Sequence, residues 1–262
     1  MGNIEDKLNH KKMETLVEKT IGQYVADDFR TAAIFSKYGI DFCCKGNRTL
    51  AEACESKQIN SATLEQEINT VLDHKNKEGI DFKSWPLDLL VDYIEKTHHR
   101  YVQEKTTVLY RFLDKLCKVH GGRHPELLEI NNLFIAGAGE LAKHMMKEEL
   151  VLFPFIKRMV ETKSKSESIT MPHFGSVDNP IAMMKDEHTT EGERFAKIAE
   201  LTNNYTPPTD ACETYKVTFA MLQEFEQDLH KHIHLENNIL FPEAQLLEKK
   251  FTILDRLSST LL

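Results

Sequence analysis

One internal repeat constrains the fold of this 262-residue chain more than any other feature. The repeated motif is His-x-x-x-Glu followed by Leu-Phe-Pro, and its two copies span residues 144–154 and 232–242, 88 residues apart. A histidine stands ahead of each copy, His99 before the first and His188 before the second, 89 residues apart. Each half therefore combines a helix with one histidine and a helix with a His/Glu pair. Two such halves predict an approximate twofold axis through the core.

The spacing inside the motif predicts which way its polar side chains point. Residues i and i+4 lie one above the other on a helix, so His144 projects together with Glu148, and His232 together with Glu236. Apolar residues stand ten and three positions before each motif histidine and seven positions after it. They belong to the same helical stripe, which is the stripe that faces a core. The histidines and glutamates are therefore predicted to be buried.

A buried set of carboxylates and imidazoles indicates a metal site. An unpaired buried ion costs several kcal/mol, and a bound metal removes that cost. Imidazole with carboxylate suits non-haem iron, manganese or zinc, and helical bundles commonly hold such sites in their cores. Four histidines and two glutamates related by a twofold axis suit two ions, each with two imidazoles, bridged by both carboxylates and an oxo or hydroxo group. The predicted ligands are His99, His144, Glu148, His188, His232 and Glu236.

Several assignments stay open at this point. His98 adjoins His99, and apolar neighbours at helical spacing fit either residue; the 89-residue correspondence favours His99. Four further residues are expected to contact the ligands or to face solvent, and Glu187 is the most important of them; the set is Glu140, Glu149, Glu187 and His234. The competing hypothesis is a metal-free bundle whose histidines have ordinary core partners.

The rest of the chain predicts an all-α protein of two domains. Eight prolines and eleven glycines leave room for long helices. Four long helices in a row are typical of an up-and-down bundle, and they are expected at about 85–118, 126–160, 180–203 and 209–249. Shorter helices are expected at 15–25, 31–38, 49–55 and 61–74, with Gly39 as a C-cap. The polar stretch 75–79 reads as a linker, so the predicted domains are 1–78 and 79–262.

Five cysteines, an odd number, do not suggest a secreted disulfide framework. Cys54, Cys117 and Cys212 stand singly among helical residues and are expected to be small buried side chains. Cys43 and Cys44 are adjacent, beside Lys45 and Gly46. They fit equally well a core cysteine beside a surface one, or a redox or metal-handling thiol pair next to a cation that favours thiolate.

Composition limits the classes of function. The net charge of −8 at pH 7 disfavours a nucleic-acid partner. No apolar run approaches the roughly 18–20 residues of a membrane helix, and the polar N-terminus lacks a signal-peptide core. The expectation is a soluble cytoplasmic protein.

The residues resemble the family of iron-sulfur cluster repair di-iron proteins, in which a haemerythrin-like domain follows a short domain with a cysteine pair. The motifs that carry the resemblance are Tyr38–Leu50 around Cys43-Cys44, the two His-x-x-x-Glu copies with Leu-Phe-Pro, and Lys185-Asp-Glu-His188. The resemblance implies a haemerythrin-like four-helix bundle, a non-haem di-iron centre on the six predicted ligands with bridging glutamates, and thiol chemistry at Cys43 and Cys44. The Gly-Gly-Arg-His turn after Cys117 departs from the family pattern.

The function implied is a stress response in which clusters damaged by nitric oxide or peroxide are repaired, by donation of iron. Implied partners are damaged iron-sulfur proteins and small molecules such as nitric oxide or oxygen, and a homodimer is compatible. Two alternatives are nitric oxide reduction at the di-iron centre and reversible oxygen binding or sensing, the second of which leaves the cysteine pair without a role.

Overall fold

The computed structural model describes residues 19–73, 80–165 and 167–260, with side chains described up to residue 251. The described chain divides into two compact units. The first comprises the residues up to Trp85 together with His234–Ile239, and the second comprises 86–233 and 240–262. Among the described helices, none combines the length and the apolar character that crossing a membrane requires. The predicted domain boundary at 78/79 and the predicted linker 75–79 fall on residues 74–79, outside the described residues.

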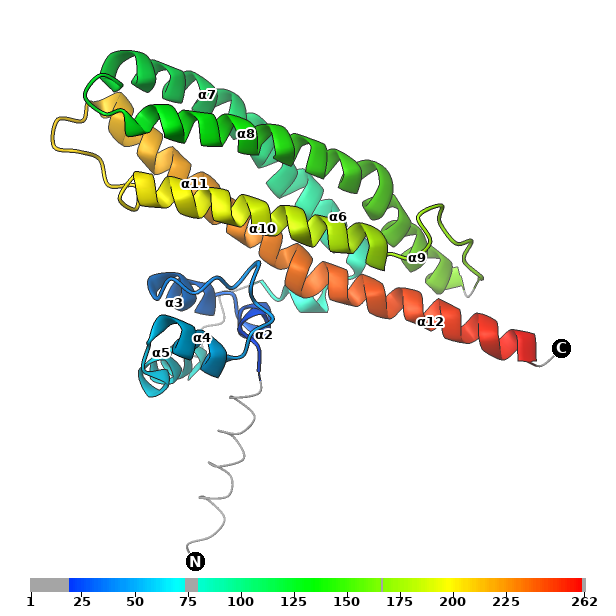
Figure 1. Cartoon of the computed structure of the whole chain (residues 1–262). Helices are drawn as coiled ribbons and strands as arrows, with labels where there is room; N and C mark the ends of the chain where they lie inside the picture. Colours follow the sequence, from blue (N-terminus) through cyan, green and yellow to red (C-terminus); the bar gives the residue numbers. More distant parts are fainter. Residues whose placement is uncertain (1–18, 74–79, 166, 261–262) are drawn as a thin grey trace, which may run out of the picture. The chain divides into compact units, whose positions relative to one another are not determined.

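Long helices make up the second unit and confirm the predicted all-α class (Figure 1). Two of the predicted helices each contain a short π-helical stretch near the middle, and a third contains one near its start. The segments are α6 (Leu87–Tyr93), η2 (Ile94–His99) and α7 (Arg100–His120); α8 (Glu126–Lys147), η3 (Glu148–Leu152) and α9 (Phe153–Lys165); α10 (Asp178–Leu201); and α11 (Glu213–Leu235), η4 (Glu236–Leu240) and α12 (Phe241–Thr260). Within the last of these helices, the stretch His234–Ile239 is grouped with the first unit.

Packing in this unit centres on aromatic side chains between the helices. Helix α8 packs against both α7 and α10. Phe225 of α11 is 1% exposed, and its ring meets Tyr101 of α7, Phe134 of α8 and Phe195 of α10. One side chain thus contacts all three other helices, which is the arrangement of a four-helix bundle core. Burying a phenylalanine in this way stabilises the fold by about 1.5–3 kcal/mol.

The three π-helical stretches are the local feature that the sequence analysis missed. A π-turn inserts one residue into an α-helix, and such turns occur often at functional sites. In η3 the amide of Phe153 donates to the carbonyl of Glu148, five residues earlier. Pro154 and Pro242 follow η3 and η4 closely, and a proline cannot donate the usual bond to the carbonyl four residues before it. The Leu-Phe-Pro repeat therefore carried a signal for these turns, whereas η2 has no comparable proline.

The first unit is a cluster of short helices, α2 (Ile21–Asp27), α3 (Thr31–Lys37), α4 (Leu50–Lys57) and α5 (Ser61–Asp73), followed by the 3₁₀ turn η1 (Phe82–Ser84). Helices α2 and α4 both begin with a capping box, formed by Thr20 with Gln23 and by Thr49 with Glu52. Helix α3 ends as predicted, because Gly39 has a φ of 62° that glycine adopts without strain.

Several helix limits differ from those predicted. Helix α2 spans Ile21–Asp27 rather than 15–25, of which residues 15–18 lie outside the described part of the chain, and the last helix continues through α12 to Thr260 rather than ending at about 249. Helix α9 continues to Lys165, and α11 begins at Glu213 rather than at about 209. The later start has a structural reason, because the amide of Ala211 donates to the carbonyl of Pro208 and closes a turn there. The expectation that Cys212 is a buried side chain within a helix is also wrong. Cys212 precedes the helix and is exposed, while Cys54 is buried and Cys117 is half-buried.

Glu226 of α11 gives a pH-dependent contribution to stability. Burial raises the pKa of this carboxyl to about 7, and the neighbouring Tyr205 hydroxyl lowers it by less. Because the pKa is higher in the folded chain than in the unfolded chain, the unfolded state binds fewer protons between about pH 4.5 and 7, and stability falls as pH rises through that window. Glu226→Gln is therefore expected to raise the free energy of unfolding at pH 8 by on the order of 2 kcal/mol. Urea unfolding at pH 5 and pH 8 checks this, since an equal change at both pH values contradicts the assignment.

Candidate metal centre

The structure brings the six predicted ligands together in two groups of buried side chains. One group is His99, Glu148, His232 and Glu236, and the other is His144, Glu148, His188 and Glu236. Within each group one nitrogen or oxygen atom per residue lies within 4.8 Å of all the others. Both glutamates belong to both groups. The arrangement is that of two adjacent ligand sets sharing two carboxylates.

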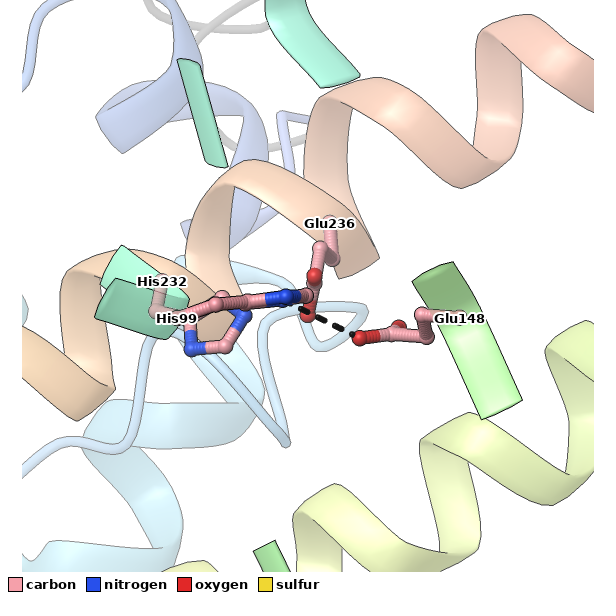
Figure 2. A group of neighbouring side chains, drawn as sticks. All are labelled: His99, Glu148, His232 and Glu236. Atoms are coloured by element: carbon pink, nitrogen blue, oxygen red, sulfur yellow. Dashed lines mark ion pairs between the residues drawn. The ribbon is translucent and has the colours of Figure 1, made fainter. Parts of the chain in front are cut away.

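Three of these residues stand on π-helical stretches. His99 ends η2, Glu148 begins η3, and Glu236 begins η4. Figure 2 shows the four side chains directed toward one another, His99 and Glu148 from two different helices and His232 with Glu236 from neighbouring turns of a third. The Nε2 atom of His99 lies 3.4 Å from a carboxylate oxygen of Glu148, whose side chain is fully buried.

The second group has equally short distances. The Nε2 atom of His144 lies 3.3 Å from Glu148 Oε2 and 3.0 Å from the Nε2 atom of His188. His144 and Glu148 come from neighbouring turns of one helix, as the i, i+4 spacing predicted, and His188 comes from α10. Both histidines are at most 3% exposed.

Carboxylates outside the two groups orient two of the imidazoles. The Nδ1 atom of His99 lies 2.8 Å from Glu149, and that of His144 lies 2.8 Å from Glu187. Because a carboxylate accepts, Nδ1 carries the hydrogen in both rings and the Nε2 lone pair faces the group. Hydrogen bonding to His144, with Lys147 as a further partner, lowers the pKa of Glu187 to about 2. Carboxylate–histidine pairs of this kind are typical of metal ligands.

The donor set fits a non-haem metal site. Histidine binds a metal as the neutral imidazole, through a nitrogen lone pair such as the one on Nε2 here. A bound cation would also offset the negative charge of the two fully buried glutamates. A set of imidazole and carboxylate ligands suits iron better than it suits soft ions, which prefer thiolate ligands. The role of each residue as a ligand stays a prediction.

The position of His98 bears on the alternative that the sequence left open. His98 is as buried as His99, but it belongs to neither group. Its Nδ1 atom lies 2.9 Å from Asp228, and its ring stacks on that of His232 at an interplanar angle of 10°. His98 therefore packs against the ring of His232, while His99 supplies a nitrogen atom to the first group of candidate ligands.

Glu187→Gln tests the carboxylate that orients His144. The amide can still accept a hydrogen bond, but the charge that strengthens the bond is lost. We expect the affinity for iron to fall about tenfold or more, as removal of such partners usually does. Competition with a chelator of known affinity measures the change. The control is Glu193→Gln, an exposed carboxylate on the same helix, which should leave the affinity unchanged.

A pocket of about 320 Å³ opens beside the second group and is lined by His144, His188 and the carboxylates of Glu187 and Glu191. Gly137 of α8 leaves room for the Glu191 and Arg194 side chains, which line the pocket, since a Cβ atom there would lie 2.8 Å from a Glu191 oxygen. The pocket is large enough for a small molecule to reach the edge of the group.

The cysteine pair lies in a tight turn of the first unit. Asp41 Oδ1 accepts the amide hydrogens of Cys43 and Cys44, at 3.1 and 2.9 Å, and the two sulfur atoms are 3.7 Å apart. Cys43 is buried and Cys44 is half-buried. The neighbouring Cys44 thiol and burial raise the pKa of the Cys43 thiol. The Asp41 carboxylate thus contacts the pair, and Asp41 with the two thiols forms a third group able to hold a metal.

His234 has a different place from the one expected. It is 1% exposed, its ring packs against Phe29 and Phe42, and its Nδ1 atom accepts from Asn238 at 3.0 Å. Burial lowers its pKa to about 3, so the ring is neutral. His234 is neither solvated nor a contact of the ligand groups but a core residue of the first unit. The motif alone did not distinguish it, because its neighbours in sequence are the ligands themselves.

A helical bundle whose core gathers buried histidines and glutamates in this way defines a haemerythrin-like metal-binding protein. The Hemerythrin HHE cation binding domain matches residues 91–244, and a Domain of Unknown function (DUF542), ScdA_N, matches residues 17–72.

Similar proteins include the iron-sulfur cluster repair protein ScdA of Staphylococcus haemolyticus, 33% identical over 86% of this chain and 96% of the relative. The iron-sulfur cluster repair proteins YtfE of Musicola paradisiaca and of Escherichia coli are each 33% identical over 87% of this chain and 96% of the relative. The chain belongs to the haemerythrin-like family of iron-sulfur cluster repair proteins represented by ScdA and YtfE.

Proposed function

We propose that this protein repairs iron-sulfur clusters damaged by oxidative or nitrosative stress, and that it does so by donating iron from a non-haem di-iron centre. The observation that carries the proposal is the pair of buried His/Glu groups sharing Glu148 and Glu236, in a chain whose relatives are named iron-sulfur cluster repair proteins.

The two groups suggest which residues hold which ion. His99 and His232 would hold one iron, His144 and His188 the other, and Glu148 and Glu236 would bridge them, with an oxo or hydroxo group as a further bridge. Bound iron supplies a redox-active ion whose ligands can exchange. The protein's own part is to orient the imidazoles through Glu149 and Glu187 and to keep the carboxylates buried.

Cys43 and Cys44 are proposed to take part in the transfer of iron or nitric oxide. The support is their geometry, since two thiols and the Asp41 carboxylate meet in one turn. Thiolates are ligands for iron, and a vicinal pair with an adjacent carboxylate can hold an ion while other ligands exchange. Cys44 is the more accessible of the two.

The test is repair of an iron-sulfur enzyme whose cluster has been damaged with nitric oxide. Iron-loaded protein is incubated anaerobically with the damaged enzyme, and recovered activity is compared with that given by an equal amount of free ferrous iron. Recovery beyond free iron supports donation, and recovery equal to it contradicts donation.

Two variants separate the parts of the proposal. Cys43→Ala is expected to retain iron and to transfer it poorly, whereas Glu236→Ala is expected to lose iron. Exposed Glu193→Gln serves as the matched control, with unchanged iron and unchanged repair. Full repair by the cysteine variant would remove the thiols from the mechanism while leaving the metal centre untouched.

A second candidate is reduction of nitric oxide, and the pocket beside His144 and His188 favours it because a diatomic molecule could reach the group there. Two adjacent ferrous ions could take up two molecules of nitric oxide. Catalytic formation of nitrous oxide under anaerobic turnover supports this activity, and stoichiometric binding alone contradicts it. Reversible oxygen binding is a third proposal, and rapid irreversible oxidation of the iron in air would exclude it.

The proposed partners are damaged iron-sulfur proteins, and the proposed location is the cytoplasm, where thiols stay reduced. No disulfide joins any of the five cysteines, all of which lie in the described residues, and this fits a reducing compartment. Formation of a homodimer stays a prediction that the molar mass in solution tests.

A further inference from the structure

A second cluster of reactive side chains lies where the loops after α7 and α10 meet in the second unit. His120 ends α7 and His124 stands in the turn that follows it, and the loop 202–212 contributes Asp210 and Cys212. His120 Nε2 lies 3.3 Å from the Cys212 sulfur, and His124 Nε2 lies 3.0 Å from an oxygen of Asp210. None of these residues belongs to the metal groups of the described chain.

The thiol of Cys212 differs from the other single cysteines in its exposure. Cys54 is buried and Cys117 is half-buried, and burial raises the pKa of both thiols. The sulfur of Cys117 is also bound, since it donates to the carbonyl of Leu127 at 3.3 Å. Cys212 is exposed. A reagent in solution can therefore approach this residue.

The hydrogen bond between His120 and Cys212 has a defined donor. His120 is 5% exposed, and its Nδ1 atom is buried with no hydrogen-bond partner among the described residues. Placing the ring hydrogen on Nδ1 would bury an N–H group without an acceptor, which proteins rarely do. We therefore assign the hydrogen to Nε2, which donates to the sulfur. Such a bond stabilises the negative charge that the sulfur carries when it attacks.

The start of α11 adds to this effect. The amide of Lys216 donates to the carbonyl of Cys212, so Cys212 is the residue that caps a helix of 23 residues. Free amide groups and the helix dipole at such a position favour negative charge. Reactive cysteines occur in environments that combine partial exposure, a histidine and a helix N-terminus.

We propose that Cys212 is a modification site that reacts with low-molecular-weight disulfides, activated by His120. The sulfur of Cys212 attacks one sulfur of the small disulfide, the disulfide bond breaks, and a protein–small-molecule disulfide forms. The thiol proton of Cys212 is released and is taken up by the departing thiolate, so one small thiol leaves. The Cys212 sulfur is oxidised and the departing sulfur is reduced, which needs no other reactant.

The test uses glutathione disulfide as the probe on the full-length, iron-loaded protein. Peptide mapping by mass spectrometry gives the rate at each cysteine, in the folded protein and in the urea-unfolded chain. We expect Cys212 to react at least about tenfold faster than Cys117 in the folded protein, and faster than Cys212 itself in the unfolded chain. Exposure alone cannot produce the second result, because the unfolded thiol is fully accessible.

Two matched variants isolate the role of His120. The rings of His120 and His124 both pack against Tyr215, but only His120 is bonded to the sulfur. His120→Phe keeps the ring packing and removes the donor, and it should slow the reaction of Cys212 about fivefold or more. His124→Phe should leave the rate unchanged. Equal rates in the wild-type and His120→Phe proteins, or equal slowing by both variants, would overturn the proposal; circular dichroism shows that each variant is folded.

Discussion

Replacing Glu148 by alanine is expected to lower the bound iron from about two ions per chain to one or fewer. Glu148 is fully buried, and its carboxylate belongs to both groups of candidate ligands. Its loss removes a donor from each group at once, whereas the loss of a histidine removes a donor from one group only. Metal analysis of the purified protein measures the stoichiometry, and Mössbauer spectra report whether the remaining iron is a coupled pair.

Two further variants make this result specific. Glu148→Gln keeps the size of the side chain and removes the charge, so a similar loss of iron separates ligation from packing. The control is Glu248→Ala, which removes another buried glutamate, one that accepts hydrogen bonds from Ser176 and from the amide of Val177. It should reduce stability while retaining iron. Two coupled irons in the Glu148 variants would contradict the bridging role.

Phe225→Ala is expected to lower the free energy of unfolding of the metal-free protein by about 3–5 kcal/mol, the usual cost of deleting a fully buried ring. Phe225 is 1% exposed and packs against Tyr101, Phe134 and Phe195, one from each of the other long helices. Removing the ring leaves a cavity that no single helix can fill by moving. Urea unfolding of the metal-free chain measures the loss, because bound metal would add its own stabilisation.

The matched control stands on the same helix. Val217 of α11 is 46% exposed, so Val217→Ala should change stability by about 0.5 kcal/mol or less. A loss below about 1.5 kcal/mol for Phe225→Ala would show that the aromatic cluster is not the centre of the bundle. Iron binding should partly restore the variant, since ligands from several helices hold those helices together.

Much of the fold was predictable because it depends on local spacing. The i, i+4 separation of His144 and Glu148 places both side chains on one face of any helix, and the apolar stripe around them predicts that this face is buried. The repeat then predicted that the second pair does the same. The π-turns could be anticipated only in part, since prolines follow η3 and η4 but not η2.

The neighbours of the site were less predictable, because they come from distant parts of the chain. Glu149 contacts His99 and Glu187 contacts His144, across 50 and 43 residues. His98 and His99 could not be ranked by apolar spacing, because both lie in the π-helical stretch η2 and both are buried. A π-turn changes the rotation per residue, so counting in steps of 3.6 fails there.

The sequence by itself determined the helical class, the two repeated His/Glu pairs and the burial of their side chains, because each follows from the order of residues along a helix. Only the tertiary structure decided which two imidazoles belong to each group, which carboxylates orient which imidazoles, and that Cys212 is exposed beside His120. These depend on distances between helices, and such distances are set by side-chain packing throughout the core rather than by any one segment.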